Sequence, residues 1–346
     1  MMNKSFAISM LTLALCATQA VADEHKFYGR IDYSVTNSDS GSATHKNKSG
    51  TVLENNFTRI GIKGASQLTD STSLFYQIEV GVNGESQDSG DKPFSARPTF
   101  IGVKHSTYGA LAVGRIDPVF KMAKGMSDAM DNYSLKHDRL FAGDKRWGDS
   151  FEYKSAHWNK LQLGVSYLLE DNHYTNNDNR RDNGNYQLAV TYGDKFFKTG
   201  DVYAAVAYSD GVEDIEAYRG VVQYKWDKWQ FATMLQHSKL VNTDKIDWQQ
   251  REGDGVIVSA KYQLGQLSLK AQYGFDNSGT GLIANRVYAS KNTLIDEVPE
   301  ISQWAIGAEY KLSKSTRLHT EIGQFYVKQY DDFDDTIVSL GMRYDF

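Results

Sequence analysis

Cysteine is almost absent from this chain. Cys16 is the only cysteine among 346 residues, and it lies in an N-terminal segment that we expect to be removed. The mature chain therefore has no disulfide and no thiolate for catalysis or for a metal site. Its stability must come from buried surface, from backbone pairing or from a surrounding membrane.

Long hydrophobic runs and a strong charge imbalance are also missing. Beyond the N-terminal segment no stretch of about 18 apolar residues occurs, and the mean hydropathy is −0.51, so the sequence excludes a membrane-spanning helix. The net charge is −5, and this mild acidity argues against a nucleic-acid binder. No linker or composition shift follows residue 22, which favours a single domain over residues 23–346.

Residues 1–22 have the pattern of a secretory signal peptide. Lys4 supplies the positive charge, residues 6–17 the apolar segment, and residues 20–22 (Ala-Val-Ala) a small-x-small cleavage site. The apolar run is too short to span a membrane, so we expect cleavage after residue 22. A lipoprotein anchored through Cys16 is the alternative, which the bulky residue before that cysteine disfavours.

The mature chain is rich in Tyr and Gly and alternates between apolar and polar residues. Residues 27–36 (FYGRIDYSVT) show this period of two, which is typical of a β-strand with one apolar face. A polar loop rich in Ser, Asn and Gly is expected to follow as far as Asn55. The pattern predicts sixteen strands, at residues 27–36, 57–66, 74–82, 96–105, 110–116, 146–154, 161–169, 186–192, 202–208, 218–226, 229–240, 255–264, 267–275, 301–312, 317–327 and 336–346.

These strands are joined by short turns that alternate strictly with longer loops. Segments near ten residues match a tilted strand that crosses the hydrocarbon layer. A soluble sandwich has no need for short connections at one end and long ones at the other. We therefore predict an all-β protein, a 16-stranded antiparallel transmembrane β-barrel whose closure leaves no unpaired edge in lipid.

Aromatic residues lie near the strand ends on the apolar face, where the membrane interface would be dry on one side and wet on the other. The residues are Phe27, Tyr33, Phe57, Tyr167, Tyr192, Trp226, Trp229, Trp304, Tyr310 and Tyr344. In the last strand, an apolar period of two runs from Val338 to Tyr344 and the terminal Phe346. Such an ending resembles the assembly signal of outer-membrane β-barrels.

One long segment, residues 117–145, does not read as a strand. It contains apolar residues that need burial, such as Phe120, Met130 and Phe141, and is not of low complexity. Unbroken segments of this length in a regular β sequence are usually functional or disordered. We expect it to fold back inside the barrel and narrow the bore; the alternative is an ordinary surface loop.

The whole mature chain resembles a general diffusion porin of the Gram-negative outer membrane, the trimeric sixteen-stranded kind. Four stretches carry the resemblance: FYGRIDYSV and FTRIGIKGASQLTDS near the start, ARPTFIGVKHSTYGALAVGR before the long segment, and GMRYDF at the end. The resemblance implies a homotrimer with a subunit latch at residues 83–93. It also implies contact with outer-membrane lipid and lipopolysaccharide, and assembly machinery that reads the last strand.

The resemblance further implies a constriction in which a basic wall faces acids on the long loop. The wall residues would be Arg30, Arg59, Lys63, Arg97 and Arg146, the loop acids Asp117, Asp128 and Asp131, and the loop tip Gly125. Alternation independently places all of the wall residues except Arg97 opposite their apolar neighbours. The family's Pro-Glu-Phe-Gly-Gly stretch is replaced by AMDNYSLK, which leaves bore size and ion preference open.

Clustered arginines inside a barrel favour a water-filled lumen, and we hypothesise passive diffusion of small hydrophilic solutes and ions across a transverse field. A barrel closed by structural salt bridges is the alternative. A substrate-selective porin, for a sugar or for one sign of ion, is a second. An outer-membrane enzyme is a third, but no histidine lies in a catalytic or metal-binding motif, and we expect no cofactor and no metal.

Overall fold

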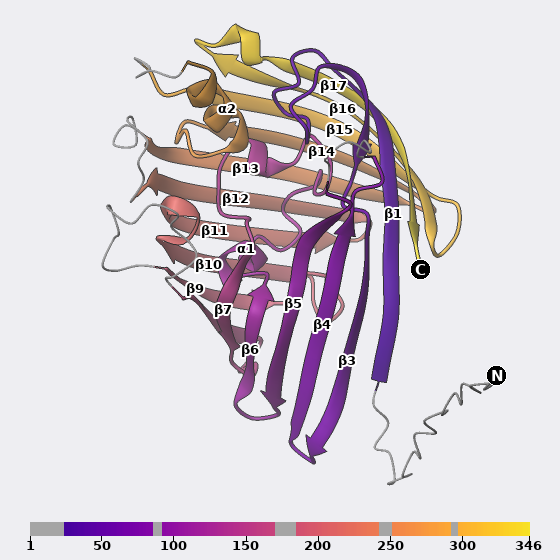
Figure 1. Ribbon diagram of the computed structural model, residues 1–346, viewed down its shortest axis with the longest axis vertical. Coiled ribbons are helices and arrows are strands. Elements are labelled where there is room, and N and C mark those ends of the chain that lie inside the picture. Colours follow the sequence, from indigo (N-terminus) through magenta and orange to yellow (C-terminus); the bar gives the residue numbers. More distant parts are fainter. Residues whose placement is uncertain (1–23, 86–91, 170–184, 242–250, 292–296) are drawn as a thin grey trace, which may run out of the picture.

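The computed structural model describes residues 24–85, 92–169, 185–241, 251–291 and 297–346. The strands form a tall curved wall, and the segment that contains helix α1 lies within the ring they make (Figure 1). The predicted signal peptide lies outside the described residues. No helix in the described part of the chain is long and apolar enough to cross a membrane.

The strands are β1 Glu24–Ser38, β2 Gly50–Asn55, β3 Arg59–Thr69, β4 Thr72–Val82, β5 Phe94–His105, β6 Gly109–Ile116, β7 Trp147–Lys154, β8 Leu161–Leu168, β9 Tyr186–Gly193, β10 Val202–Asp210, β11 Ile215–Trp226, β12 Trp229–Leu240, β13 Glu252–Leu264, β14 Leu267–Asp276, β15 Glu300–Lys311, β16 Thr316–Lys328 and β17 Asp335–Asp345. The helices are α1 Val119–Ala123 and α2 Leu282–Lys291, with 3₁₀ turns η1 His137–Arg139, η4 Val212–Asp214 and η6 Asp331–Phe333.

The sheet closes on itself. Successive strands pair antiparallel, and β17 returns to pair with β1 from Arg30↔Asp345 to Ser38↔Ile337. Strands β2 and β3 both pair with β1 and are separated only by residues 56–58, so together they occupy the position of one strand in the barrel. The predicted 16-stranded antiparallel barrel is confirmed.

The prediction of a loop as far as Asn55 is wrong over β2. This strand has only two large apolar residues, and the lipid-facing Leu53 is followed by the buried Glu54. Glu54 accepts a hydrogen bond from the His45 backbone N–H and another from the Ser134 hydroxyl. The inward side chains of such a strand bond to loop residues, and the strand has too few apolar residues to show the period of two from which strands are predicted.

The two faces of each strand meet different solvents. On β1 the exposed side chains are apolar, Phe27 at 63% and Val35 at 55%, whereas Asp32 and Thr36 are fully buried inside the barrel. The same arrangement holds on β17, where the apolar residues predicted to face outward, from Val338 to Phe346, are all exposed. Apolar residues outside and polar residues inside are the arrangement of a barrel set in lipid.

Two local predictions need correction. Phe57, expected at the membrane interface, lies in the lumen at the break between β2 and β3, where its positive φ of 64° turns the chain. Its ring lies 4.9 Å from the Lys136 amine and 5.7 Å from the Arg97 guanidinium. The alternation of short and long connections also fails once. The connection between β10 and β11, residues 211–214, lies at the long-loop end of the barrel but is shorter than the preceding turn, residues 194–201, at the other end.

The C-terminal residue completes the seam between β1 and β17. Gly29 N donates to the Phe346 carbonyl at 2.9 Å, and Phe346 N donates to the Gly29 carbonyl at 3.1 Å. The Phe346 ring covers Gly29 so closely that a Cβ there would overlap it, and it lies 5.9 Å from the rings of both Phe27 and Tyr344.

We therefore expect Phe346→Ser to weaken the seam. Each aromatic contact of this kind contributes about 0.5–1.5 kcal/mol, so the urea midpoint of the heat-modifiable folded band should fall measurably. Phe346→Tyr keeps the ring and is the matched control. Equal midpoints for the two variants would show that the ring does not stabilise the closure.

Candidate functional site: a constriction and a vestibule inside the barrel

The long loop lies inside the barrel, as the sequence predicted. It leaves β6, forms α1 against the inner faces of β8 to β11, and returns to β7 (Figure 1). Its apolar residues Phe120, Met130, Leu135 and Phe141 are fully buried and join one hydrophobic cluster with the wall. Burial of these side chains is what holds a segment without regular structure in place.

Polar side chains of the wall fix the loop backbone strand by strand. Seven inward-facing residues from β8 to β15 each bond at least one loop N–H or C=O, in the order in which the loop passes them. The wall residues are Ser166, Gln187, Tyr203, Gln223, Ser259, Gln272 and Gln303, and their partners are Val119, Phe120, Ala123, Lys124, Ser127, Ala129 and Leu135. The loop therefore narrows the bore from the β8–β15 side and leaves the opposite wall open.

The open wall carries arginines that share too few carboxylates. Arg59 and Arg97 both pair with Glu79, Arg59 at 3.4 Å. Asp345 lies within 3.1 Å of Arg30 and is also paired with Arg317 and Arg343. These five guanidiniums and Lys270 thus face four carboxylates, because Arg317 and Lys270 also pair with Glu309 and Lys270 pairs with Glu321. The wall has an excess of positive charge.

Two β-bulges explain why alternation misplaces arginines. The pairing of β4 with β5 shifts between Ile78 and Val80, which turns Arg97 inward although its parity along β5 is that of lipid-facing residues. The pairing of β6 with β7 shifts after Gly114, whose φ is 126°, and Arg115 comes within electrostatic range of Arg97, Arg146 and Asp117. Bulges re-aim side chains in this way. The sequence analysis missed Arg115, and Gly114 within a strand was the available signal.

Not all of the predicted wall residues gather here. Arg146 pairs with Asp117 at the start of the loop, and Lys121 pairs with the same carboxylate at 2.9 Å. Burial alone would raise the pKa of Asp117, but these two cations outweigh it and lower the pKa. Lys63 lies four residues along β3 from Arg59, about 13 Å away, and covers the Tyr28 ring at 5.2 Å.

The loop residues depart further from the predicted arrangement. Asp128 is buried and accepts a bond from His137 Nδ1 at 2.8 Å, so it does not face the wall. Gly125 lies against Gln223 and Tyr203 of the barrel wall, where a Cβ would overlap the glutamine amide, and is not at a free tip. These two residues therefore anchor the loop rather than line the bore.

Asp131 is the predicted acid that does reach the bore. Its side chain is 48% exposed and pairs at 3.2 Å with Lys124, which also contacts Asp144 at 2.6 Å. Burial raises the pKa of Asp131, but the nearby Lys124 and Lys136 outweigh that effect and lower it to about 2. Asp131 therefore stays ionised, and Lys124 of the same loop offsets its charge.

The loop as a whole carries no net charge with His137 neutral. Its acids are Asp117, Asp128, Asp131, Asp138 and Asp144, and its bases are Lys121, Lys124, Lys136, Arg139 and Lys145, which are equal in number. The positive wall is therefore not opposed by a negative loop.

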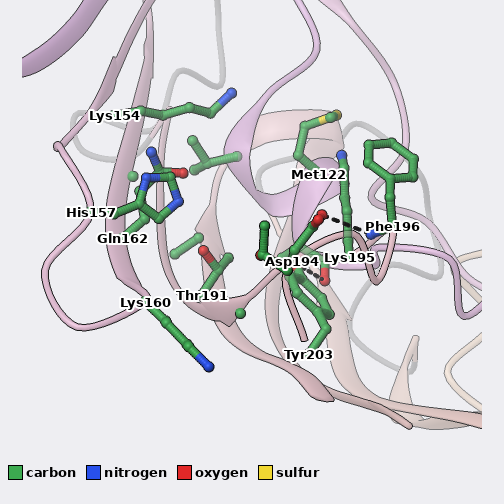
Figure 2. Close-up of a pocket in the computed structure, with 16 residues that line it drawn as sticks. Met122, Lys154, His157, Lys160, Gln162, Thr191, Asp194, Lys195, Phe196 and Tyr203 are labelled. Carbon is green, nitrogen blue, oxygen red and sulfur yellow. Dashed lines mark hydrogen bonds between the residues drawn. The ribbon is translucent and has the colours of Figure 1, made fainter. Parts of the chain in front are cut away.

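Beneath the loop, toward the short turns, the lumen widens into two adjoining cavities of about 560 and 570 Å³. Both are lined by Met122, Lys154, His157 and Gln162. Figure 2 shows the first, with Lys154 and His157 on one side and Lys195, Phe196 and Met122 on the other. We call these two cavities the vestibule.

The interior offers little for catalysis. Within the described ranges no three His, Cys, Asp or Glu side chains are grouped to hold a metal ion. The buried histidines inside the barrel bond to aspartates, His137 to Asp128 and His319 to Asp32 at 3.0 Å. What the interior provides is a narrowed aqueous passage with a charged wall.

Such a barrel, with a loop folded into its bore, defines a channel of the outer-membrane type. A family model described as Gram-negative porin matches residues 7–344. The chain therefore belongs to the Gram-negative porin family and is an outer-membrane porin, a channel for passive diffusion of small hydrophilic solutes and ions. The members of this family are channels rather than enzymes.

Individual relatives agree with this assignment. The major outer membrane protein P.IB of Neisseria meningitidis serogroup B is 27% identical, over 97% of this chain and 98% of that protein. The anion-selective porin from Comamonas acidovorans has the same fold, with a TM-score of 0.66 at 15% identity, over 94% of this chain and all of that one. The trimer form of OmpT from Vibrio cholerae has a TM-score of 0.62 at 14% identity, with coverage of 94% and 100%.

The histidine at the centre of the loop makes its anchoring dependent on pH. Burial would lower the pKa of His137, but attraction by Asp144 and Asp128 outweighs burial and raises the pKa above 6.5. Since the folded pKa exceeds the unfolded one, charged His137 stabilises the structure fully below about pH 6.5, and this contribution is lost as pH rises through the raised value.

We therefore expect the difference in melting temperature between the native protein and His137→Gln to be largest near pH 6 and to shrink toward about pH 9. The matched control is His157→Gln, at an exposed histidine that has no ion pair among the described residues. A difference for His137→Gln that stays constant across this range would contradict the charged state assigned to His137.

Proposed function

We propose that the constriction of this porin favours anions. The open wall places Arg30, Arg59 and Arg97, with Arg115 and Arg343, around the passage, and sharing of Glu79 and Asp345 leaves positive charge uncompensated. The loop on the other side carries no net negative charge. Across a gap of several ångströms, shorter than the Debye length of about 8 Å at physiological salt, this charge acts on every ion that passes.

The salt bridges of the wall do not favour the alternative of a closed, plugged barrel. Arg59 and Arg30 keep part of their side chains accessible, 18% and 11%, although they are paired. Cations that share a carboxylate inside a barrel are tolerable only if water solvates the remainder. The printed name of the Comamonas acidovorans porin, anion-selective, supports the same preference.

Removal of wall charge should shift selectivity toward cations. One unit charge a few ångströms away in water changes ion energy by roughly 0.5–1 kcal/mol, so Arg59→Ala or Arg97→Ala should lower the anion-to-cation permeability ratio about two- to fivefold. Asp131→Asn should raise it, because Lys124 then has one counter-charge fewer. Reversal potentials in a salt gradient measure both changes.

The control for these variants is Lys314→Ala, in the exposed turn between β15 and β16. It removes one positive charge from the end of the barrel without touching the constriction, and we expect an unchanged permeability ratio. Shifts of the same sign for Arg59→Ala and Asp131→Asn would refute the assignment of wall and loop.

We also infer a homotrimer. The support is the fold shared with OmpT of Vibrio cholerae, which has been described in a trimer form. The expected latch, residues 83–93, lies partly outside the described residues. Within the described part Glu85 accepts a bond from Asn55 at 2.6 Å and pairs with Lys46 at 3.5 Å of its own chain.

In mild detergent the protein should sediment, or elute with light scattering, at about three times the monomer mass, and heating should reduce it to one monomer band. Deletion of residues 86–91 should lower the temperature of that dissociation, and deletion of an equal stretch from residues 170–184 should not. A native mass of one chain at all detergent concentrations would contradict the trimer.

The remaining partners stay predictions. The last strand presents Tyr344 and Phe346 outward as an assembly signal requires. In the external acidic run Asp334 accepts a bond from Val327 N and Asp335 accepts bonds from Ser38 and Ala43, whereas Asp331 and Asp332 are exposed and are the acids we propose for contact with lipopolysaccharide. Loss of the folded protein from cells carrying Phe346→Ser, with refolding in vitro retained, would support recognition of the C-terminus by assembly machinery.

A further inference from the structure

The vestibule contains lysines that the constriction does not use. Lys160 and Lys195 line the first cavity, and neither has a carboxylate within ion-pair distance among the residues that the structure describes. Lys154 lines both cavities and pairs with Glu152 at 2.7 Å. Burial, and then the nearby Lys154, lower the pKa of Lys195. Two ammonium groups that repel each other across a cavity favour an anion placed between them.

The same cavity has an apolar side. Phe196 exposes 55% of its surface on this side of the lumen, beside Met122, and Val119, Ala123 and Ala189 line the wall behind. The Phe196 ring lies 5.2 Å from the Lys195 amine and 5.7 Å from that of Lys198. An exposed aromatic ring that faces water rather than lipid leaves apolar surface for a ligand to cover.

The turn that presents Phe196 and Lys195 is held rigidly. The Asp194 carboxylate accepts bonds from the backbone N–H groups of Phe196 and Lys198, both at 2.9 Å. Gly193, with φ of 81°, packs on the Val202 carbonyl so closely that a Cβ would overlap it, and its N–H bonds to the Lys160 carbonyl at 3.0 Å. The Asp194 carboxylate therefore stabilises the turn, and the turn is already ordered before a ligand binds.

We propose that the vestibule is a binding subsite for small aromatic carboxylates, in which the carboxylate lies between Lys154 and Lys195 and the ring lies on Phe196 and Met122. The cavity of about 560 Å³ is of the size that small-molecule sites have. His157 and Gln162 line the same space and offer further polar contacts. This subsite deepens the proposed anion preference and rests on it, because a carboxylate that crosses the channel must also pass the arginine wall.

Block of single-channel current in planar bilayers tests the subsite, with benzoate as the probe. Benzoate added on the short-turn side should interrupt the potassium chloride current at concentrations at which acetate, benzyl alcohol and benzylamine do not. Lys195→Gln and Phe196→Ser should each raise the half-blocking benzoate concentration about fivefold or more, measured against each variant's own open current.

The matched control is Lys314→Gln, which removes a lysine from another turn at the same end of the barrel and should leave the half-blocking concentration unchanged. Equal block by acetate would show a general anion effect and overturn the aromatic subsite. Unaltered block in Lys195→Gln and Phe196→Ser would overturn its location. A reversal potential without anion preference in the native protein would instead contradict the proposed selectivity, so the two failures are distinguishable.

Discussion

The pairing of β17 with β1 is the constraint on which the rest of the structure depends. In a bilayer no water satisfies an unpaired strand edge, so the sheet must close before it can be stable. Once closed, it has a lipid face that must be apolar and an inner face that is free to be polar. The glutamines and serines that hold the loop, such as Gln187 and Gln303, can lie only on that inner face, because polar side chains on the lipid face would be destabilising. The constriction can therefore form only in a sheet that has closed.

The charges of the bore follow from how few carboxylates the wall supplies. Glu79 is shared by Arg59 and Arg97, and Asp345 by three arginines. Full pairing would neutralise the wall and allow it to dehydrate, whereas sharing keeps it charged and hydrated. The loop, by contrast, pairs its aspartates with its own lysines and with His137. The anion preference that we propose thus rests on an imbalance on one wall rather than on opposition between wall and loop.

The barrel was predictable from the sequence because its signal is local. A period of two reports which solvent each side chain meets, and it placed Arg30, Arg59 and the outward face of β17 correctly. It failed at Arg97, since one residue is inserted in β5 and inverts the parity there without changing composition. It failed also at β2, whose inward Glu54 serves a loop far along the chain.

The loop could be recognised from sequence but its contacts could not. Its apolar residues showed that it must be buried, yet wall residues that hold its backbone lie more than a hundred residues away, such as Gln272 for the Ala129 N–H beside Asp128. Asp128 and Asp131 have the same chemistry and lie three residues apart. One is buried beside His137 and the other reaches the bore, because the backbone between them is bound to the wall at Ala129. Hydrogen bonds from the wall therefore determine which carboxylate an ion in the passage meets.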